Sequence, residues 1–260
     1  MRLLMVAVMF LTRIRGPATW MISAEDVGLS AGFFPLVGAA IGAIQWCALW
    51  AILVAIDHAK HVTASPIPLP VSVLSILVTA IGVWLTGALH LDGIADMADG
   101  FGGGRTREDV LRIMRDHAVG SYGTIALILV LSLKFASTAV LINRGTVLPY
   151  LIIAPALGRA STVALAFSLP YARASDGGLG GSVQYTGPWQ LVLSTSTAIG
   201  FALLAGWKRA AICALVVLLV TIWIARLSGR RIGGMTGDIL GATSETCEAL
   251  VLATGAILSL

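Results

Sequence analysis

Three aspartates with helical spacing, Asp92, Asp96 and Asp99, follow a long apolar run of the sequence. Separations of four and three residues would place all three carboxylates on one face of a helix, within two turns. The residues between them are apolar, and no basic residue stands four positions beyond any of them. Hard oxygen ligands favour Mg²⁺ or Mn²⁺ over Zn²⁺. We therefore predict that these aspartates form one Mg²⁺-dependent unit; a solvated acidic helix face is the alternative.

Residues on both sides of the aspartates are candidates for binding phosphate. Gly102, Gly103 and Gly104 would let backbone N–H groups approach a phosphate, although the run matches neither a P-loop nor a dinucleotide-binding motif. His90 precedes the first aspartate by two positions and could orient a metal ligand or a phosphate. A lone histidine of this kind is more often a hydrogen-bonded packing residue. We therefore predict that the glycines and His90 bind substrate, with a purely structural role as the alternative for each.

Arginines follow the glycine run in a segment that is compatible with a helix. The stretch carries Arg105, Arg107, Arg112 and Arg115. Its arginines, Arg105, Arg112 and Arg115 in particular, could clamp a pyrophosphate, because a guanidinium binds phosphate oxygens in a bidentate manner. The alternative is an amphipathic helix that touches anionic lipid. The sequence leaves the two interpretations open.

The last apolar run carries Asp238, Glu245 and Glu248. An acidic residue in the middle of a membrane span costs a few kcal/mol, so these side chains should face a polar interior. Asp238 and Glu245 are seven residues apart and share a helix face. We predict that Asp238 or Glu245 assists the three aspartates in catalysis.

Two cations, Lys134 and Arg159, lie near the middle of other apolar runs. Ion pairs with Glu245 or Glu248 are one interpretation. Binding of a substrate phosphate in a polar cavity is the other.

The elements that position these residues are membrane helices. The chain is 57% hydrophobic and 12% charged, whereas a soluble domain carries about 25% charged residues. A hydrocarbon core about 30 Å thick needs about 20 helical residues. Runs of that order predict seven spans in an all-α, polytopic bundle that forms a single membrane-embedded domain, residues 1–260. The spans are expected at residues 32–56, 71–90, 122–142, 146–169, 189–207, 210–225 and 236–260.

Seven spans would distribute the basic residues unevenly between the two sides of the membrane. One side would hold eleven, namely Arg2, Arg13, Arg15, Arg105, Arg107, Arg112, Arg115, Arg173, Arg226, Arg230 and Arg231, and the other would hold four, namely Lys60, Arg144, Lys208 and Arg209. Lys and Arg are retained on the cytoplasmic side. We therefore expect a cytoplasmic N-terminus and an active site that faces the cytoplasm. The net charge of +4 then requires no nucleic acid, since basic and aromatic residues are not interleaved.

Other features of the sequence have structural interpretations. Residues 1–11 should form a short embedded or interfacial helix, because no small-residue cleavage site follows them. Cys47, Cys213 and Cys247 stand far apart in or beside apolar runs and are expected to be buried small hydrophobic residues. Pro35, Pro149 and Pro155 are expected to kink spans. The oligomeric state stays open, and a homo-oligomer is compatible with the sequence.

Several motifs together resemble a known family. The run GALHLDG at residues 87–93 continues to Asp99 and is followed by GGGR at 102–105, RIMRD at 112–116 and GSYG at 120–123. Further segments agree in order: FLTRI at 10–14, FPLVG at 34–38, PYAR at 170–173, GLG at 178–180 and GGMTGD at 233–238. The chain thus resembles the cobalamin synthases over nearly its whole length.

The resemblance implies an activity and its participants. Cobalamin synthases join adenosylcobinamide-GDP to α-ribazole, or to its 5′-phosphate, and release GMP. A ribose hydroxyl would attack the phosphorus that is attached to the aminopropanol arm. The resemblance also implies Mg²⁺ as the cofactor, the cytoplasmic membrane as the location and Arg173 as a further substrate-binding residue. Phosphoryl transfer is mainly positioning and charge neutralisation, which a carboxylate-held metal and nearby arginines can provide.

Two other functions compete with this one. A CDP-alcohol phosphotransferase of lipid synthesis also uses a stacked acidic motif, but there Ala-Arg follows the first Asp-Gly, whereas here Asp96 follows Ala95. A cation-coupled secondary transporter would also carry intramembrane charges, but it predicts an inverted repeat, and we find none. Both are weaker than the cobalamin synthase prediction.

Overall fold

The computed structural model describes residues 1–17, 20–63, 70–173 and 185–259. GLG at 178–180 lies outside these residues. The helices are α1 (Arg2–Leu11), α2 (Ala24–Ser30), η1 (Ala31–Phe33), α3 (Phe34–Thr63), α4 (Val71–Thr86), α5 (Leu89–Gly103), α6 (Arg107–Ile113), α7 (Ser121–Asn143), α8 (Val147–Ser168), α9 (Pro188–Ala202), η3 (Leu203–Ala205), α10 (Trp207–Ile232) and α11 (Gly237–Leu258). The only extended pairing in the described chain is an isolated bridge between Tyr171 and Met235. The all-α prediction is confirmed.

Five stretches of the described chain are long and apolar enough to cross a membrane. They are Ala24–His58, Ser121–Asn143, Val147–Ser168, Pro188–Ala205 and Trp207–Ile232, and α4 with α5 would make a sixth. The predicted number of seven is therefore not confirmed. Part of the reason is that the run at residues 71–90 breaks after 16 helical residues of α4. The other part is α11, which is long enough, but its acidic and small polar residues lower its hydropathy.

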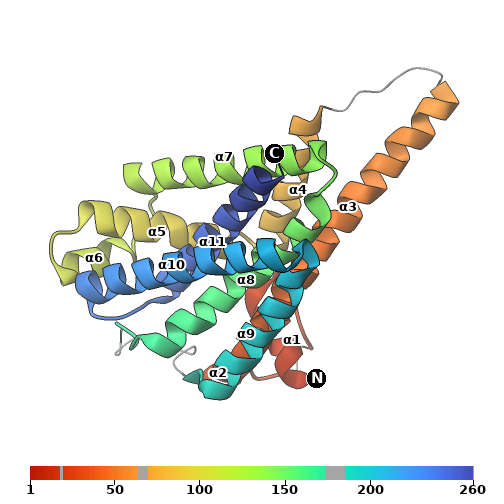
Figure 1. Cartoon of the computed structure of the whole chain (residues 1–260). Coiled ribbons are helices and arrows are strands. Elements are labelled where there is room, and N and C mark those ends of the chain that lie inside the picture. The colour runs from red at the N-terminus through yellow and green to blue at the C-terminus, as the bar shows by residue number, and fades with distance from the viewer. Residues whose placement is uncertain (18–19, 64–69, 174–184, 260) are drawn as a thin grey trace.

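A sharp bend separates α4 from α5. Gly87 and Ala88 both adopt left-handed backbone conformations, with φ of 64° and 62°. This conformation is easy for glycine and strained for alanine, and Ala88 is the only residue other than glycine with positive φ in the described chain. The bend turns α5 by 89° from the axis of α4. As a result, the aspartate helix α5 lies alongside α7, whereas α4 runs across the direction of α7 (Figure 1).

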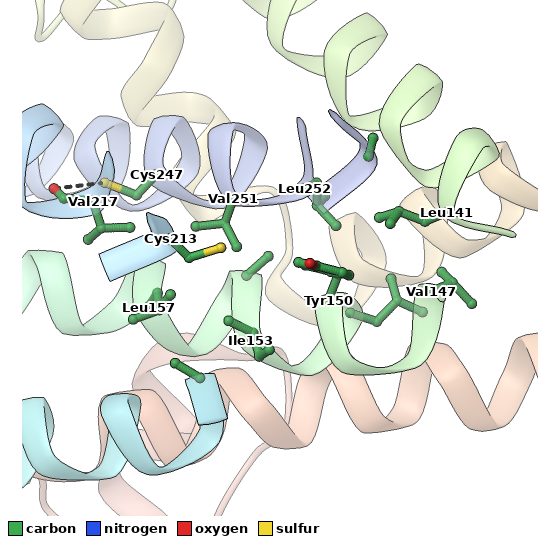
Figure 2. Packing of buried hydrophobic residues seen from close by; sticks show 14 of the residues in the cluster. Leu141, Val147, Tyr150, Ile153, Leu157, Cys213, Val217, Cys247, Val251 and Leu252 are labelled. Atoms are coloured by element: carbon green, nitrogen blue, oxygen red, sulfur yellow. Dashed lines mark hydrogen bonds between the residues drawn. The ribbon is translucent and has the colours of Figure 1, made fainter. Parts of the chain in front are cut away.

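The two central helices are α8 and α11, which pack against each other and against most of the other helices (Figure 1). Their apolar side chains form the main core together with residues of α7 and α10, including Tyr150, Ile153, Cys213, Cys247 and Val251 (Figure 2). On its other side α8 packs against α3, where a Cβ atom on Gly38 or Gly42 would collide with the backbone of α8. Small residues at this spacing let membrane helices approach closely.

Three smaller predictions have mixed outcomes. Residues 2–11 do form a helix, which packs on α2 and α3. Cys213 and Cys247 are buried, but Cys47 is exposed, because α3 buries only part of its circumference against the bundle. Pro35 and Pro149 lie in the first turns of α3 and α8, where a missing N–H breaks no intrahelical bond, so neither requires a kink.

Candidate active site

The aspartate helix α5 packs closely against the first half of α11. A Cβ atom added to Gly93 would lie 3.1 Å from the backbone nitrogen of Ala242, and one added to Gly241 would lie 3.3 Å from the Cα atom of His90. The two glycines therefore allow backbone-to-backbone approach. Because of this approach, the aspartates of α5 lie beside the first turn of α11, which carries Asp238.

The segment after α8 brings an arginine to the same place. The N–H of Ala172 donates to the carbonyl of Met235 at 2.8 Å, and the N–H of Met235 donates to the carbonyl of Pro170 at 2.9 Å. This short pairing holds Arg173 beside α11, where its guanidinium lies 3.1 Å from Oδ2 of Asp238. The predicted site residues Arg173 and Asp238, which are far apart in the sequence, are thus brought together.

Three carboxylates and one guanidinium form this acidic cluster: Asp92, Asp96, Asp238 and Arg173. Asp92 is exposed, whereas Asp96 and Asp238 are partly buried. Asp96 interacts electrostatically with Asp238, Asp92 and Arg173, and its side chain has no hydrogen-bond partner in the described part of the chain. With three carboxyl groups against one guanidinium, the cluster has an excess of acidic groups. It therefore favours binding of a cation.

Asp99 has a different environment from the other two aspartates. Its Oδ2 accepts a hydrogen bond from the N–H of Gly120 at 2.7 Å, and its Oδ1 accepts one from the N–H of Gly123 at 2.9 Å. These donors are the free N–H groups at the N-terminus of α7, where the helix dipole also favours a negative charge. Asp99 therefore caps α7 and ties it to α5. Sequence reasoning missed this role, although the glycines of GSYG were a signal, because a Cβ on Gly120 would lie 2.5 Å from Oδ1 of Asp99.

The donor set fits an open Mg²⁺ site rather than a closed one. No group of three His, Cys, Asp or Glu side chains is arranged to hold a metal ion within the residues that the structure describes. Mg²⁺ is commonly bound by one or two carboxylates and completes its shell with water and substrate phosphates. Asp92 and Asp96 suit this mode, since one is exposed and the other has no hydrogen-bond partner in the described chain.

The glycine run does not form an open phosphate-binding loop. Gly102 and Gly103 are the last residues of α5, and the N–H of Gly104 donates to the carbonyl of Gly100 at 2.9 Å. A Cβ on Gly102 would lie 2.5 Å from the ring of Tyr122, and one on Gly104 would lie 2.6 Å from the side chain of Val110. The close packing of α5 against α6 and α7 therefore accounts for Gly102 and Gly104, whereas Gly103 has more space.

Two arginines hold this end of the bundle together: Arg107, from the stretch of the predicted clamp, and Arg231, which was not among the predicted site residues. Arg107 donates to the carbonyls of Ile232 and Ala172 at 2.8 and 3.0 Å. Arg231 donates to the carbonyls of Phe101 and Gly104 at 2.7 and 2.8 Å. Neither follows a motif that would distinguish it from other basic residues near the membrane surface.

The predicted pyrophosphate clamp lies on and beside α6. Thr106 caps this short helix, and its hydroxyl together with Arg112 holds the pKa of Asp109 below its usual range. Arg105, Arg112 and Arg115 are all exposed, and Arg112 lies 3.4 Å from Asp109. This position suits both a phosphate clamp and lipid contact, so the two interpretations stay predictions.

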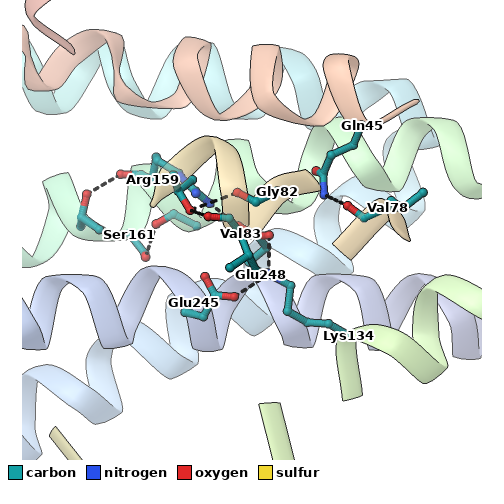
Figure 3. A network of polar contacts seen from close by, with 12 residues as sticks. Gln45, Val78, Gly82, Val83, Lys134, Arg159, Ser161, Glu245 and Glu248 are labelled. Atoms are coloured by element: carbon teal, nitrogen blue, oxygen red, sulfur yellow. Dashed lines mark hydrogen bonds and ion pairs between the residues drawn. The ribbon is translucent and has the colours of Figure 1, made fainter. Parts of the chain in front are cut away.

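A second charged cluster, formed by Lys134, Arg159, Glu245 and Glu248, is buried between α7, α8 and α11 (Figure 3). Nζ of Lys134 lies 2.5 Å from Glu245 and 2.7 Å from Glu248, and Arg159 pairs with the other oxygen of Glu248. The four formal charges sum to zero. The ion pairs expected from the sequence are therefore present.

This network leaves little room for a substrate. The two cavities beside it have volumes of only about 10 Å³ each, which is about the space of one water molecule. A phosphate at Lys134 or Arg159 would have to displace a buried carboxylate. Glu245 is engaged by Lys134, about 10 Å of helical rise from Asp238. The geometry therefore favours a structural role for Lys134, Arg159 and Glu245.

His90 faces this network rather than the acidic cluster. Its ring is buried and interacts electrostatically with Arg159, Glu248 and Lys134. Nδ1 has no hydrogen-bond partner among the described residues. The burial supports a packing role for His90, but the hydrogen bond expected of such a histidine is not found among the described residues.

Comparison with known proteins identifies the family. The model of the cobalamin-5-phosphate synthase family matches residues 3–256. The chain belongs to this family. A protein of Pseudomonas syringae pv. syringae named adenosylcobinamide-GDP ribazoletransferase is 38% identical over 97% of this chain and 98% of its own length. Proteins of the same name from Prosthecochloris aestuarii and Syntrophobacter fumaroxidans are 37% and 36% identical, over 90% and 96% of both chains. No solved structure matches the chain.

Membership in the cobalamin-5-phosphate synthase family confirms the resemblance found in the sequence motifs. The match includes α5, the first turn of α11 and the segment with Arg173, so every residue of the acidic cluster lies within it. Neither competing function, the CDP-alcohol phosphotransferase or the transporter, is favoured by these comparisons.

Proposed function

We propose that this chain is an adenosylcobinamide-GDP ribazoletransferase. It joins adenosylcobinamide-GDP to α-ribazole, or to its 5′-phosphate, giving adenosylcobalamin, or its phosphate, and GMP. The full-length relatives that carry this name support the activity. The structural observation that carries the proposal is the convergence of Asp92, Asp96, Asp238 and Arg173. Such a cluster suits transfer between phosphorylated substrates.

The reaction exchanges one bond to phosphorus for another. A ribose hydroxyl of the acceptor forms a new P–O bond at the phosphorus attached to the aminopropanol arm. The bond from this phosphorus to the bridging oxygen of the pyrophosphate breaks, and GMP leaves with the electron pair. Asp92 is exposed, and its carboxylate oxygen that is not used for Mg²⁺ can accept the hydroxyl proton. Arg173, which Asp238 holds in place, can pair with a phosphate oxygen and offset the charge that develops on GMP.

Mg²⁺ is the proposed cofactor, and Asp92 and Asp96 are the residues that would hold it. When bound, it would neutralise phosphate oxygens of the pyrophosphate. Asp99 contributes differently in this proposal, because its cap on α7 fixes the end of α5 from which Asp92 and Asp96 project.

The proposed location is the cytoplasmic membrane, with the acidic cluster open to the cytoplasm. The excess of basic residues on the side that holds Arg105 and Arg107 supports this orientation. Both substrates are highly polar and would then reach the site without crossing the bilayer.

One reaction tests the proposal. Purified protein is mixed with Mg²⁺, adenosylcobinamide-GDP and α-ribazole, and GMP and the complete corrinoid are measured by chromatography. We expect both products in equal amounts. GMP release without joined corrinoid, or no reaction beside an active relative, would contradict the proposed function.

A further inference from the structure

A separate cavity of about 620 Å³ lies between α4 and α7, at the bend that leads into α5. Its volume falls within the range of small-molecule sites. The walls are mostly apolar and include the rings of Phe135 and Trp84, and since Trp84 is 67% exposed, the cavity is open to the outer surface of α4 and α7. Arg13 is the only charged residue among the described residues that line the cavity. A ligand for this cavity should therefore combine a flat apolar part with one anionic group.

The chain holds Arg13 in place at this cavity. Its backbone N–H donates to the carbonyl of Leu85 at 2.8 Å, which fastens the segment after α1 to the end of α4. A Cβ on Gly87 would lie 3.0 Å from Cγ of Arg13, so the glycine leaves room for the arginine stem. The guanidinium has no hydrogen-bond or ion-pair partner in the described part of the chain. Its charge is thus available to an anion.

The cavity adjoins the acidic cluster through the first turn of α5. Ala88 lines the cavity, and the N–H of Asp92 donates to the carbonyl of Ala88 at 2.9 Å. Residues four apart share a helix face, so Asp92 lies one turn beyond the cavity wall, about 6 Å along the helix. A ligand seated in the cavity can therefore extend a polar group toward Asp92.

We infer that this cavity binds the nucleoside acceptor of the reaction, an inference that rests on the proposed function. The aromatic base packs between α4 and α7 near Trp84 and Phe135, and the 5′-phosphate pairs with Arg13. The ribose lies between them, with its nucleophilic hydroxyl toward Asp92. The pyrophosphate of the other substrate carries more charge than one arginine can match, and it belongs beside Arg173. A phospholipid held at Arg13 is the competing occupant.

The test compares two acceptors that differ only in the 5′-phosphate. For Arg13→Gln we expect the KM of α-ribazole 5′-phosphate to rise about tenfold or more, since a charge-assisted contact is lost. The KM of unphosphorylated α-ribazole should change less than twofold, and Arg13→Lys should recover part of the loss. Trp84→Ala should raise both KM values. Arg15→Gln is the matched control, because Arg15 is exposed and does not line the cavity.

Other outcomes would overturn the inference. If the KM values of the two acceptors change equally, or do not change, the 5′-phosphate does not bind at Arg13. Loss of co-purified anionic lipid from Arg13→Gln in native mass spectrometry, with both KM values unchanged, would assign the cavity to a phospholipid. Failure of the proposed function is distinguishable, because the unaltered protein would then form no corrinoid product at all. Binding of α-ribazole 5′-phosphate by calorimetry, weakened by Arg13→Gln, would still support the cavity assignment in that case.

Discussion

Replacing Asp99 distinguishes two roles that fit the spacing of the aspartates equally well, namely capping of α7 and binding of Mg²⁺. The carboxylate accepts two backbone hydrogen bonds at the N-terminus of α7, at 2.7 and 2.9 Å. Removal of a helix cap costs about 0.5–2 kcal/mol, and hydrogen bonds to a charged group contribute about 1.5–3 kcal/mol each when buried. Asp99 is only partly buried, so we expect Asp99→Ala to lower the free energy of unfolding by about 2 kcal/mol.

Asp99→Asn should be milder. The amide keeps one acceptor oxygen but presents an N–H₂ group to the second backbone donor, so about half of the stabilisation is lost, or about 1 kcal/mol. For a chain of this length, 1 kcal/mol corresponds to a Tm shift of about 2–4 °C. Turnover should fall because α5 is held less firmly. The Mg²⁺ concentration that gives half-maximal rate should stay unchanged.

Asp96→Asn is the matched comparison. Asp96 lies near the like charges of Asp92 and Asp238 and has no hydrogen-bond partner in the described chain, so its neutralisation should leave Tm unchanged or raise it slightly. Turnover should fall about 100-fold or more, because in the proposed mechanism Asp96 would help to hold the Mg²⁺ that neutralises the reacting phosphates. The assays are thermal unfolding in detergent and GMP release during Mg²⁺ titration. If Asp99→Asn keeps its Tm while its Mg²⁺ dependence shifts, Asp99 is a metal ligand and the capping interpretation is wrong.

Four further outcomes can be measured. Lys134→Met leaves two buried carboxylates short of a cation and should cost about 3–5 kcal/mol in thermal unfolding, whereas Lys208→Met at the exposed Lys208 should cost little. Gly93→Ala should lower stability by about 1–3 kcal/mol and reduce turnover, because its Cβ would collide with α11. Arg112→Gln should raise the KM of adenosylcobinamide-GDP if Arg112 binds pyrophosphate, with Arg226→Gln as the control. Unchanged kinetics of Arg112→Gln together with an altered membrane partition would favour lipid contact. A cysteine in place of Arg105, with the exposed Cys47 replaced by alanine, should react with impermeant reagents only from the cytoplasm, and labelling from outside would overturn the orientation.

Much of the architecture could be predicted because membrane helices reveal themselves by length and hydropathy. The limits of that signal are specific. The run at residues 71–90 reads as one span, yet the backbone reverses handedness at Gly87 and Ala88, and a hydropathy pattern does not encode dihedral angles. Cys47 and Cys213 have similar apolar neighbours in sequence, but only one faces the bundle, because burial depends on which side of α3 or α10 is packed.

The acidic cluster could be predicted only in part, for a related reason. Helical spacing correctly places Asp92 and Asp96 on one helix, but it says nothing about which carboxylates meet hydrogen-bond donors from elsewhere. Asp99 meets the N–H groups of α7 because α5 and α7 lie antiparallel, and that contact joins residues 21 and 24 positions apart. The proximity of Arg173 to Asp238 likewise depends on the pairing between the segment after α8 and the start of α11.

Charge balance along α11 explains why its acidic residues divide into two groups. Glu245 and Glu248 lie where α11 is buried on most of its circumference, and an unpaired carboxylate there would be strongly destabilising. Lys134 of α7 and Arg159 of α8 neutralise them. Asp238 lies in the first turn, partly exposed, with one arginine shared among three carboxylates. The neutral network fixes α11 against its neighbours, while the excess of acidic groups lies at the start of α11, beside the exposed Asp92 of α5. In the proposed mechanism, a cation and the phosphates of the substrate would therefore bind at Asp92 and Asp96 rather than at the buried glutamates.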